Sequence, residues 1–239
     1  MMSDLTAAAI DLLKDLIGIP SFSRQEDKTA DRIGEWFDHY GIPYQRDGNN
    51  LWAKNKAFDS KKPTLLLNSH HDTVKPNAAY TNDPFEAKIE DGKLYGLGSN
   101  DAGGALVSLI ALFTHYFNKE NPKYNLLVTA SAEEEIAGDD SLSGLLPKLP
   151  KIDVAIVGEP TEMHLAVAEK GLIVFDAVIT GTPGHAAHPN ADNPIMKLPE
   201  VLSWFENFKL QKFSDFLGDV KVTVTQVRAG KEHNVVPAS

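Results

Sequence analysis

Imidazole and carboxylate side chains gather in four short polar clusters along this 239-residue chain. Residues 69–72 read Ser-His-His-Asp, residues 133–135 are three glutamates, and Glu159 precedes a proline. The fourth group is Asp101, which follows the glycine-rich loop at residues 96–100. Side chains of these types serve as metal ligands or as general acids and bases. Their chemistry therefore depends on whether the fold brings them together.

An apolar segment runs directly into each of the first three clusters; these segments are residues 64–67, 125–130 and 153–157. Because apolar and polar residues do not alternate in them, we expect strands that are buried on both faces in the middle of a helix-covered sheet. Residues 102–113 are apolar nearly all round and predict a buried helix that Asp101 opens. Strands that alternate with helices indicate an α/β fold.

The carboxyl ends of neighbouring parallel strands form the ligand site of an open α/β sheet. If the three strands are parallel neighbours, one spot would hold one imidazole and five carboxylates, from His70, Asp72, Asp101, Glu134, Glu135 and Glu159. Carboxylates that close cannot all ionise without compensation, and one or two divalent metal ions would provide it. Imidazole with carboxylates and no thiolate suits zinc, with cobalt or manganese as substitutes.

Spacing within two clusters suggests different roles for neighbouring residues. Residues i and i+2 of a strand share a face, so Asp72 can accept the second ring N–H of a metal-bound His70. Glu134 and Glu135 are adjacent and point in different directions, so one can bind metal while the other stays free as a base. Each cluster taken alone has a plainer interpretation, such as a solvated acidic loop at residues 133–135. Only their combination favours a shared metal site.

Amphipathic helices are predicted over residues 4–17 and 27–40, where apolar residues recur at helical spacing. After about residue 170 the pattern changes. We expect a strand over residues 172–180, a helix over 194–208 that Pro199 kinks or delays, and a half-exposed strand over 220–225.

The change of pattern divides the chain into two predicted domains. Residues 1–170 form the α/β metal-binding domain, and residues 171–239 form a smaller α+β domain that looks unfinished at its end. We expect this second domain to lack part of its sheet, since the chain stops soon after what looks like the start of another strand.

Composition excludes several classes of protein. Lys and Arg number 23 against 33 Asp and Glu, a net charge of −10, which argues against nucleic-acid binding. There is no cysteine, so disulfides, thiolate metal sites and a cysteine nucleophile are impossible. No apolar run approaches ~18 residues, so we expect no membrane span. The N-terminus lacks the basic region of a secretory signal, and a cytoplasmic location is expected.

Six segments, in order, resemble the acetylornithine deacetylase / succinyl-diaminopimelate desuccinylase family of di-zinc metallopeptidases and aminoacylases. They are residues 67–74, 94–101, 131–135, 157–161, 181–185 and 233–237. The resemblance implies a zinc-exopeptidase-like catalytic domain, with helices on both faces of a mostly parallel sheet, and a smaller α+β lid domain. It makes residues 1–170 the catalytic domain and residues 171–239 the lid, through which a homodimer would form.

The resemblance also implies four metal ligands. His70 and Glu159 would bind one zinc, Asp101 would bridge two zinc ions, and Glu135 would bind the second. Family members carry a further histidine ligand in a C-terminal segment that returns to the catalytic domain, and this chain stops before such a segment. We therefore expect a fragment of a longer protein that binds at most one zinc tightly, is poorly soluble or associates through exposed apolar surface, and has very low activity.

Four further residues take catalytic or substrate-binding roles by resemblance. Glu134 would be the general base, Asp72 would orient the metal-bound histidine, His185 would stabilise the oxyanion, and Asn234 would lie near the substrate. The implied reaction is removal of an N-acyl group from a small amino acid. Residues 68–76 and 94–109 favour the acetylornithine branch of the arginine pathway. The alternatives are succinyl-diaminopimelate desuccinylase, a dipeptidase or carboxypeptidase, and a non-catalytic family member.

Overall fold

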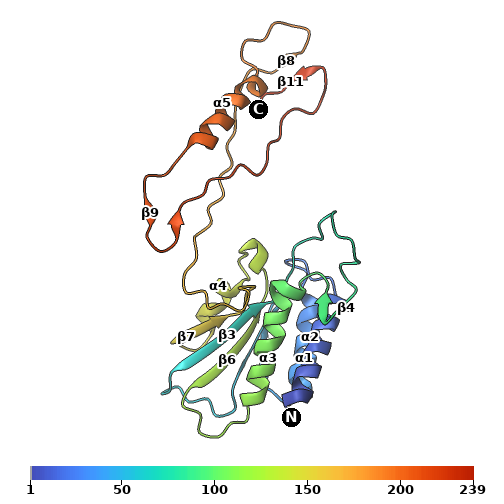
Figure 1. Cartoon of the computed structure of the whole chain (residues 1–239), viewed down its shortest axis with the longest axis vertical. Helices are drawn as coiled ribbons and strands as arrows, with labels where there is room; N and C mark the ends of the chain where they lie inside the picture. Colours follow the sequence, from blue (N-terminus) through green and yellow to red (C-terminus); the bar gives the residue numbers. More distant parts are fainter. Residues whose placement is uncertain (1) are drawn as a thin grey trace. The chain divides into compact units, whose positions relative to one another are not determined.

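The structure, a computed structural model, describes residues 2–239 and divides into two compact units. The first unit ends at Met163, and the second spans His164–Ser239 (Figure 1). This division falls before the predicted boundary at residue 170. The catalytic and lid roles of the two units stay predictions.

A five-stranded mixed sheet forms the centre of the first unit, in the order β1-β2-β6-β3-β7. The strands are β1 (Tyr44–Asp47), β2 (Asn50–Lys54), β3 (Thr64–His70), β6 (Asn125–Ser131) and β7 (Val154–Val157). β3 pairs in parallel with both β6 and β7, whereas β1 and β2 add antiparallel strands on the far side of β6. The predicted α/β class is confirmed, with the three cluster-bearing strands as parallel neighbours.

Helices α1 (Met2–Ile17), α2 (Asp27–His39) and α3 (Gly104–Tyr116) lie beside one another and confirm the three predicted helices, with α3 starting after Asp101 (Figure 1). Alternate residues of the strands face two separate cores. Leu67 and Val128 join α1, α2 and α3 in the larger core, and their neighbours Leu66 and Leu127 join Leu145 in the smaller one. Leu145 belongs to the short helix α4 (Leu142–Leu145), so the sheet is covered on both faces.

Short elements complete the first unit. They are the hairpin of β4 (Lys88–Glu90) and β5 (Lys93–Tyr95), the turn η1 (Ser99–Gly103), and the single turns η2 (Glu134–Ile136) and η3 (Leu146–Lys148). Two of them, η1 and η2, carry candidate site residues. No helix in the described range is both long and apolar enough to cross a bilayer.

The second unit contains one helix and two small ladders. The predicted helix is confirmed as α5 (Pro194–Asn207), with Pro199 inside it. β8 (Gly184–His185) pairs with β11 (Val235–Val236), and β9 (Phe213–Ser214) pairs with β10 (Gly218–Asp219). The strands predicted over residues 172–180 and 220–225 are wrong, because neither segment finds a hydrogen-bonded partner strand. Alternation favours an extended chain, but only pairing makes a strand.

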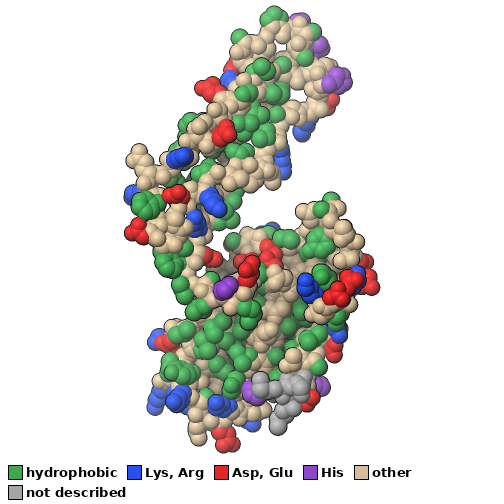
Figure 2. All heavy atoms as spheres, in the orientation of Figure 1, with side chains coloured by type: hydrophobic (Ala, Val, Ile, Leu, Met, Phe, Trp, Pro, Cys, Tyr) green, Lys and Arg blue, Asp and Glu red, His purple; other side chains and the backbone are tan. Residues whose placement is uncertain are grey.

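One further expectation is wrong: β7 is not buried on both faces. Val154, Ile156 and Val157 are 61%, 46% and 52% exposed, and Figure 2 shows hydrophobic side chains on the surface there. β7 lies at the edge of the sheet beside β3, and none of its residues joins the two cores that cover β3 and β6. An apolar sequence allows a strand to be buried on both faces, but it does not determine whether other elements cover those faces.

Candidate metal centre

Three parallel strands deliver their polar clusters to one edge of the sheet. In the ladder, His70 at the end of β3 stands opposite Ser131 at the end of β6, and Asn68 stands opposite Val157 at the end of β7. Glu134 therefore follows β6, and Glu159 follows β7, beside the same end of β3. The prediction that the clusters after β3, β6 and β7 converge at the carboxyl ends of these strands is confirmed.

Asp101 reaches the same edge from the turn η1, which precedes α3. Gly98 opens this turn with a φ of +72°, and its carbonyl accepts the N–H of Gly103 at 2.8 Å. A Cβ at Gly98 would lie 2.7 Å from Cγ2 of Thr73, so both the backbone conformation and the space favour glycine. The glycine-rich loop thus lets η1 approach the strand that carries His70.

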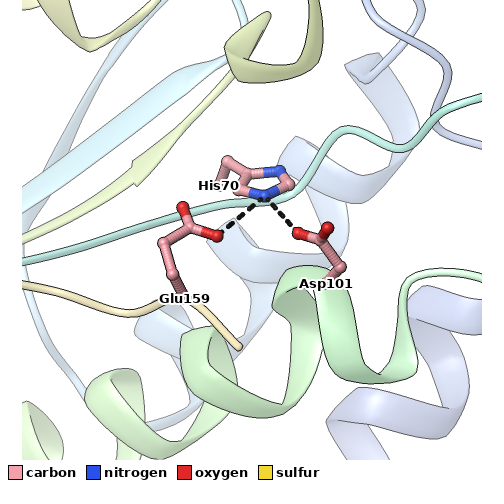
Figure 3. A group of neighbouring side chains, drawn as sticks. All are labelled: His70, Asp101 and Glu159. Atoms are coloured by element: carbon pink, nitrogen blue, oxygen red, sulfur yellow. Dashed lines mark hydrogen bonds and ion pairs between the residues drawn. The ribbon is translucent and has the colours of Figure 1, made fainter. Parts of the chain in front are cut away.

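The Nε2 atom of His70 is surrounded by carboxylates. It lies 3.2 Å from Oδ1 of Asp101, 3.8 Å from Oε2 of Glu159 and 3.9 Å from Oε2 of Glu134. Figure 3 shows Asp101 and Glu159 converging on this nitrogen from either side. The imidazole is fully buried, whereas the three carboxylates are 35% to 56% exposed, so the group opens to solvent on the carboxylate side.

This donor set fits a divalent cation. Ligand atoms of His70, Asp101 and Glu159 all lie within 4.8 Å of one another. One imidazole and two carboxylates match zinc, and three protein ligands leave a position for water or substrate. Among residues 2–239 this is the single group of three or more such residues, and Glu134 and Glu135 lie outside it. The Glu135 ligand stays a prediction.

Asp72 accepts a hydrogen bond from Nδ1 of His70, the ring nitrogen that faces away from the carboxylates of Asp101 and Glu159. Nδ1–H donates to the Asp72 carbonyl oxygen at 3.0 Å and lies 3.3 Å from Oδ1 of the same residue. Burial alone would lower the pKa of His70, but hydrogen bonds and charges from Asp72 and Glu159 outweigh it and raise the pKa to about 11. The imidazole is therefore doubly protonated at neutral pH when no metal is bound.

Metal binding is expected to release about one proton from His70 near neutral pH. The metal takes the Nε2 position, and its proton must leave, so metal affinity rises by about tenfold per pH unit below the histidine pKa. Calorimetric zinc titrations in buffers of different protonation enthalpy measure the number directly. Proton release of zero would show that His70 is not a ligand.

Asp72 also anchors the segment that carries the glutamates. Its Oδ1 accepts the N–H of Glu134 and its Oδ2 accepts the N–H of Glu135, each at 3.1 Å, while Ser23 donates to Oδ2 at 2.7 Å. Burial tends to raise the Asp72 pKa, but these hydrogen bonds and that from His70 lower it overall. The His-x-Asp spacing predicted the contact with His70. No sequence pattern near Asp72 predicted its hydrogen bonds to Ser23, Glu134 and Glu135.

Asp72→Asn is expected to lower zinc affinity by ~10–100-fold. An amide replaces one acceptor oxygen with a donor, so either His70 or a main-chain N–H of the glutamate segment faces another donor. Zinc titration against a competing chelator measures the change. A variant that is folded and binds zinc as tightly as the parent would contradict the positioning role of Asp72.

The carboxyl groups of Glu134 and Glu135 both have raised pKa values. Burial is the largest cause for both and raises their pKa values; nearby carboxylates, Asp101 among them, add to it, and His70 partly opposes it. Glu134 lies beside the candidate metal group without belonging to it. A carboxylate with a raised pKa at that position suits proton transfer.

The second unit brings His185 and Asn234 together. His185 pairs with Val235 in the β8–β11 ladder, and the carbonyl of Asn234 accepts the N–H of Ala186 at 2.9 Å. Nδ1 of His185 accepts the N–H of Ala187 at 3.1 Å, which leaves Nε2–H as the donor of the neutral ring. Both side chains are exposed.

Comparison with known proteins identifies the family. Residues 66–235 match the family described as Peptidase family M20/M25/M40. A succinyl-diaminopimelate desuccinylase of Buchnera aphidicola is 31% identical over 253 residues, covering 98% of this chain and 66% of the relative. One from Rickettsia felis is 29% identical, covering 96% and 66%. This chain therefore belongs to the M20/M25/M40 peptidase family, and it spans about two thirds of the length of these curated relatives.

Solved structures share the fold. An M20 family metallo-carboxypeptidase from Sulfolobus solfataricus has a TM-score of 0.53 at 26% identity and covers 63% of this chain and 37% of its own. A tripeptidase from Staphylococcus aureus has a TM-score of 0.60 at 18% identity and covers 95% and 62%. The predicted family is confirmed, but the two curated relatives named above bear the name of the alternative substrate and not that of acetylornithine.

Proposed function

We propose that this protein is a metal-dependent amidohydrolase that removes an N-succinyl group from a diamino acid. The observation that carries the proposal is the imidazole Nε2 of His70 facing the carboxylates of Asp101, Glu159 and Glu134. The names of the curated relatives support the succinyl substrate. Zinc is the proposed metal, with cobalt as a substitute. Two ions would bind per subunit of a chain as long as these relatives, and at most one would bind tightly to this 239-residue chain.

His70, Asp101 and Glu159 would hold one ion, and Asp101 and Glu135 would contribute to the second. When bound, the ions supply Lewis acidity that polarises the amide carbonyl and acidifies a water molecule. Asp72 keeps His70 in the orientation that presents Nε2.

Glu134 performs the proton transfers in this proposal. Its carboxylate accepts a proton from the attacking water and delivers it to the amine nitrogen as the amide bond breaks. The products are the succinate carboxylate and the free amine. Nε2–H of His185 would donate to the oxyanion, a contribution of roughly 3 kcal/mol for one such donor. Asn234, which directly precedes β11, would contact the substrate.

A hydrolysis screen tests this proposal. We expect the protein with zinc or cobalt to release succinate from N-succinyl-diaminopimelate, only slowly in the 239-residue chain, and to lose this activity when a chelator removes the metal. Acetylornithine is the second candidate, favoured by the resemblance of residues 68–76 and 94–109. Faster turnover of acetylornithine would replace the succinyl assignment, and no turnover of any N-acyl amino acid or dipeptide would contradict the enzyme proposal.

Two properties complete the proposal. The second unit would form a homodimer through its exposed apolar residues, which include Trp204 on α5 at 55% exposure. The protein would act on its small substrate in the cytoplasm. Sedimentation of the protein at several concentrations tests the dimer, and a monomer at all concentrations would contradict it.

A further inference from the structure

A buried carboxylate outside the candidate metal centre has no part in the proposed mechanism. The Glu26 side chain is fully buried, at 0% exposure. Its Oε1 accepts the N–H of Arg24 at 2.8 Å and that of Glu133 at 3.1 Å, and its Oε2 accepts Nδ2 of Asn49 at 2.9 Å. All three partners are N–H donors, and the two carboxylate oxygens of Glu26 accept from them.

Helix capping does not explain this carboxylate. Glu26 is the N-cap residue of α2, but its side chain makes no capping hydrogen bond to that helix. It turns instead toward Glu133, a residue 107 positions away in the sequence. Burying a charged group is costly unless its hydrogen bonds are satisfied, so the bonds to these distant segments are what hold it in place.

Four successive main-chain N–H groups after β6 are held by side chains from elsewhere. Asn50 accepts from Ala132 at 3.0 Å, Glu26 accepts from Glu133 at 3.1 Å, and Asp72 accepts from the next two residues. Glu133 has a φ of +51°, in the left-handed region. Non-glycine residues persist in that region only where the surroundings hold them.

Polar contacts also connect Glu26 to His71, the neighbour of the candidate ligand His70. The carbonyl of Asn49 accepts Nε2–H of His71 at 2.9 Å, and the Thr29 hydroxyl lies 2.9 Å from Nδ1 of His71. The same hydroxyl lies 3.0 Å from the carbonyl oxygen of Glu26. His71 is buried, and the one proton of the Thr29 hydroxyl serves either its Nδ1 or the carbonyl oxygen of Glu26.

We propose that Glu26 is a positioning residue whose buried carboxylate fixes the main chain of Glu133 and thereby sets where Glu134 and Glu135 point. The claim that this matters for turnover rests on the proposed function, in which Glu134 is the base. The claim that Glu26 orders the segment stands on the hydrogen bonds alone.

A pair of substitutions can break and then restore this contact. In Glu26→Gln the amide oxygen can accept either the main-chain N–H groups of Arg24 and Glu133 or the side chain of Asn49. It cannot accept from all three, because the amide NH2 group replaces the other acceptor and faces a donor. In Asn49→Asp two carboxylates face each other across the 2.9 Å contact. In the double variant Glu26→Gln with Asn49→Asp, the new amide at position 26 can donate to the new carboxylate at position 49, and the net charge is kept. Glu35→Gln, the same change at an exposed position of α2, is the matched control.

Residue-resolved amide hydrogen exchange provides the test. We expect both single variants to accelerate exchange at residues 132–135 by about tenfold or more, with less than about twofold change in α3. The double variant should return to within about threefold of the parent, and the control should match the parent. In a hydrolysis assay, kcat should fall about tenfold in the single variants with KM unchanged and recover in the double variant.

Unchanged exchange at residues 132–135 would overturn the proposal, as would acceleration spread evenly over the sheet and helices. If Glu26→Gln does not fold, the double variant decides. A folded double variant with parent-like exchange supports the proposal, and a double variant that fails to fold or exchanges fast overturns it. A parent protein without hydrolytic activity would count against the proposed function only, because the exchange result does not depend on turnover.

Discussion

Asp101→Ala is expected to lower zinc affinity by more than ~100-fold. Removing residues that only support metal ligands costs ~10–100-fold, and loss of a ligand should cost more. The structure places Oδ1 of Asp101 3.2 Å from Nε2 of His70, nearer than the other carboxylates that face this nitrogen. Competition of the variant and the parent with a chelator of known affinity measures the loss.

Two comparisons make this prediction specific. Asp38→Ala removes an exposed carboxylate of α2 and should leave zinc binding unchanged. His70→Ala should also lower zinc affinity. The loss should be smaller than in Asp101→Ala if Asp101 bridges two ions. Full zinc content in folded Asp101→Ala would refute its assignment as a ligand.

Glu134→Gln is expected to lower the turnover rate by ~100-fold or more while the metal content stays unchanged. The glutamine keeps the shape and the main-chain hydrogen bond to Asp72, but it cannot accept the proton of the attacking water. Metal analysis and steady-state kinetics on the same sample separate the two effects.

Glu135→Gln is the matched comparison, because it makes the same change one residue along the same segment. We expect this variant to lose metal binding at the second site, since the proposal makes Glu135 a ligand there and Glu134 the base. Exchanged phenotypes, with metal loss in Glu134→Gln and retention in Glu135→Gln, would show that the two roles are reversed.

Local sequence patterns predicted the parts of the site that local physics determines. Continuous apolar runs predicted β3 and β6, and the polar residues that follow them predicted the convergence on His70. The His-x-Asp spacing predicted that Asp72 would meet His70, and the structure gives that contact at Nδ1. The convergence needs only the topology of a parallel sheet. The contact with Asp72 was predicted from the period of a strand, but β3 ends at His70, so the turn that follows the strand makes the contact.

Long-range contacts lay beyond such patterns. Glu26 sits in a polar stretch before α2 and gives no sign of burial, because the partners that bury it follow β6 and lie in the turn between β1 and β2. The exposure of β7 is the opposite case, since its apolar sequence is the same whether or not another layer covers it. Both features depend on which segments the complete fold brings together.

The most direct test of the metal centre is a crystal structure grown with zinc, with anomalous diffraction recorded at the zinc edge. We predict an anomalous peak within coordination distance of Nε2 of His70 and of carboxylate oxygens of Asp101 and Glu159. A zinc-saturated crystal with no peak at this edge of the sheet, or with its peak on other residues, would contradict the account.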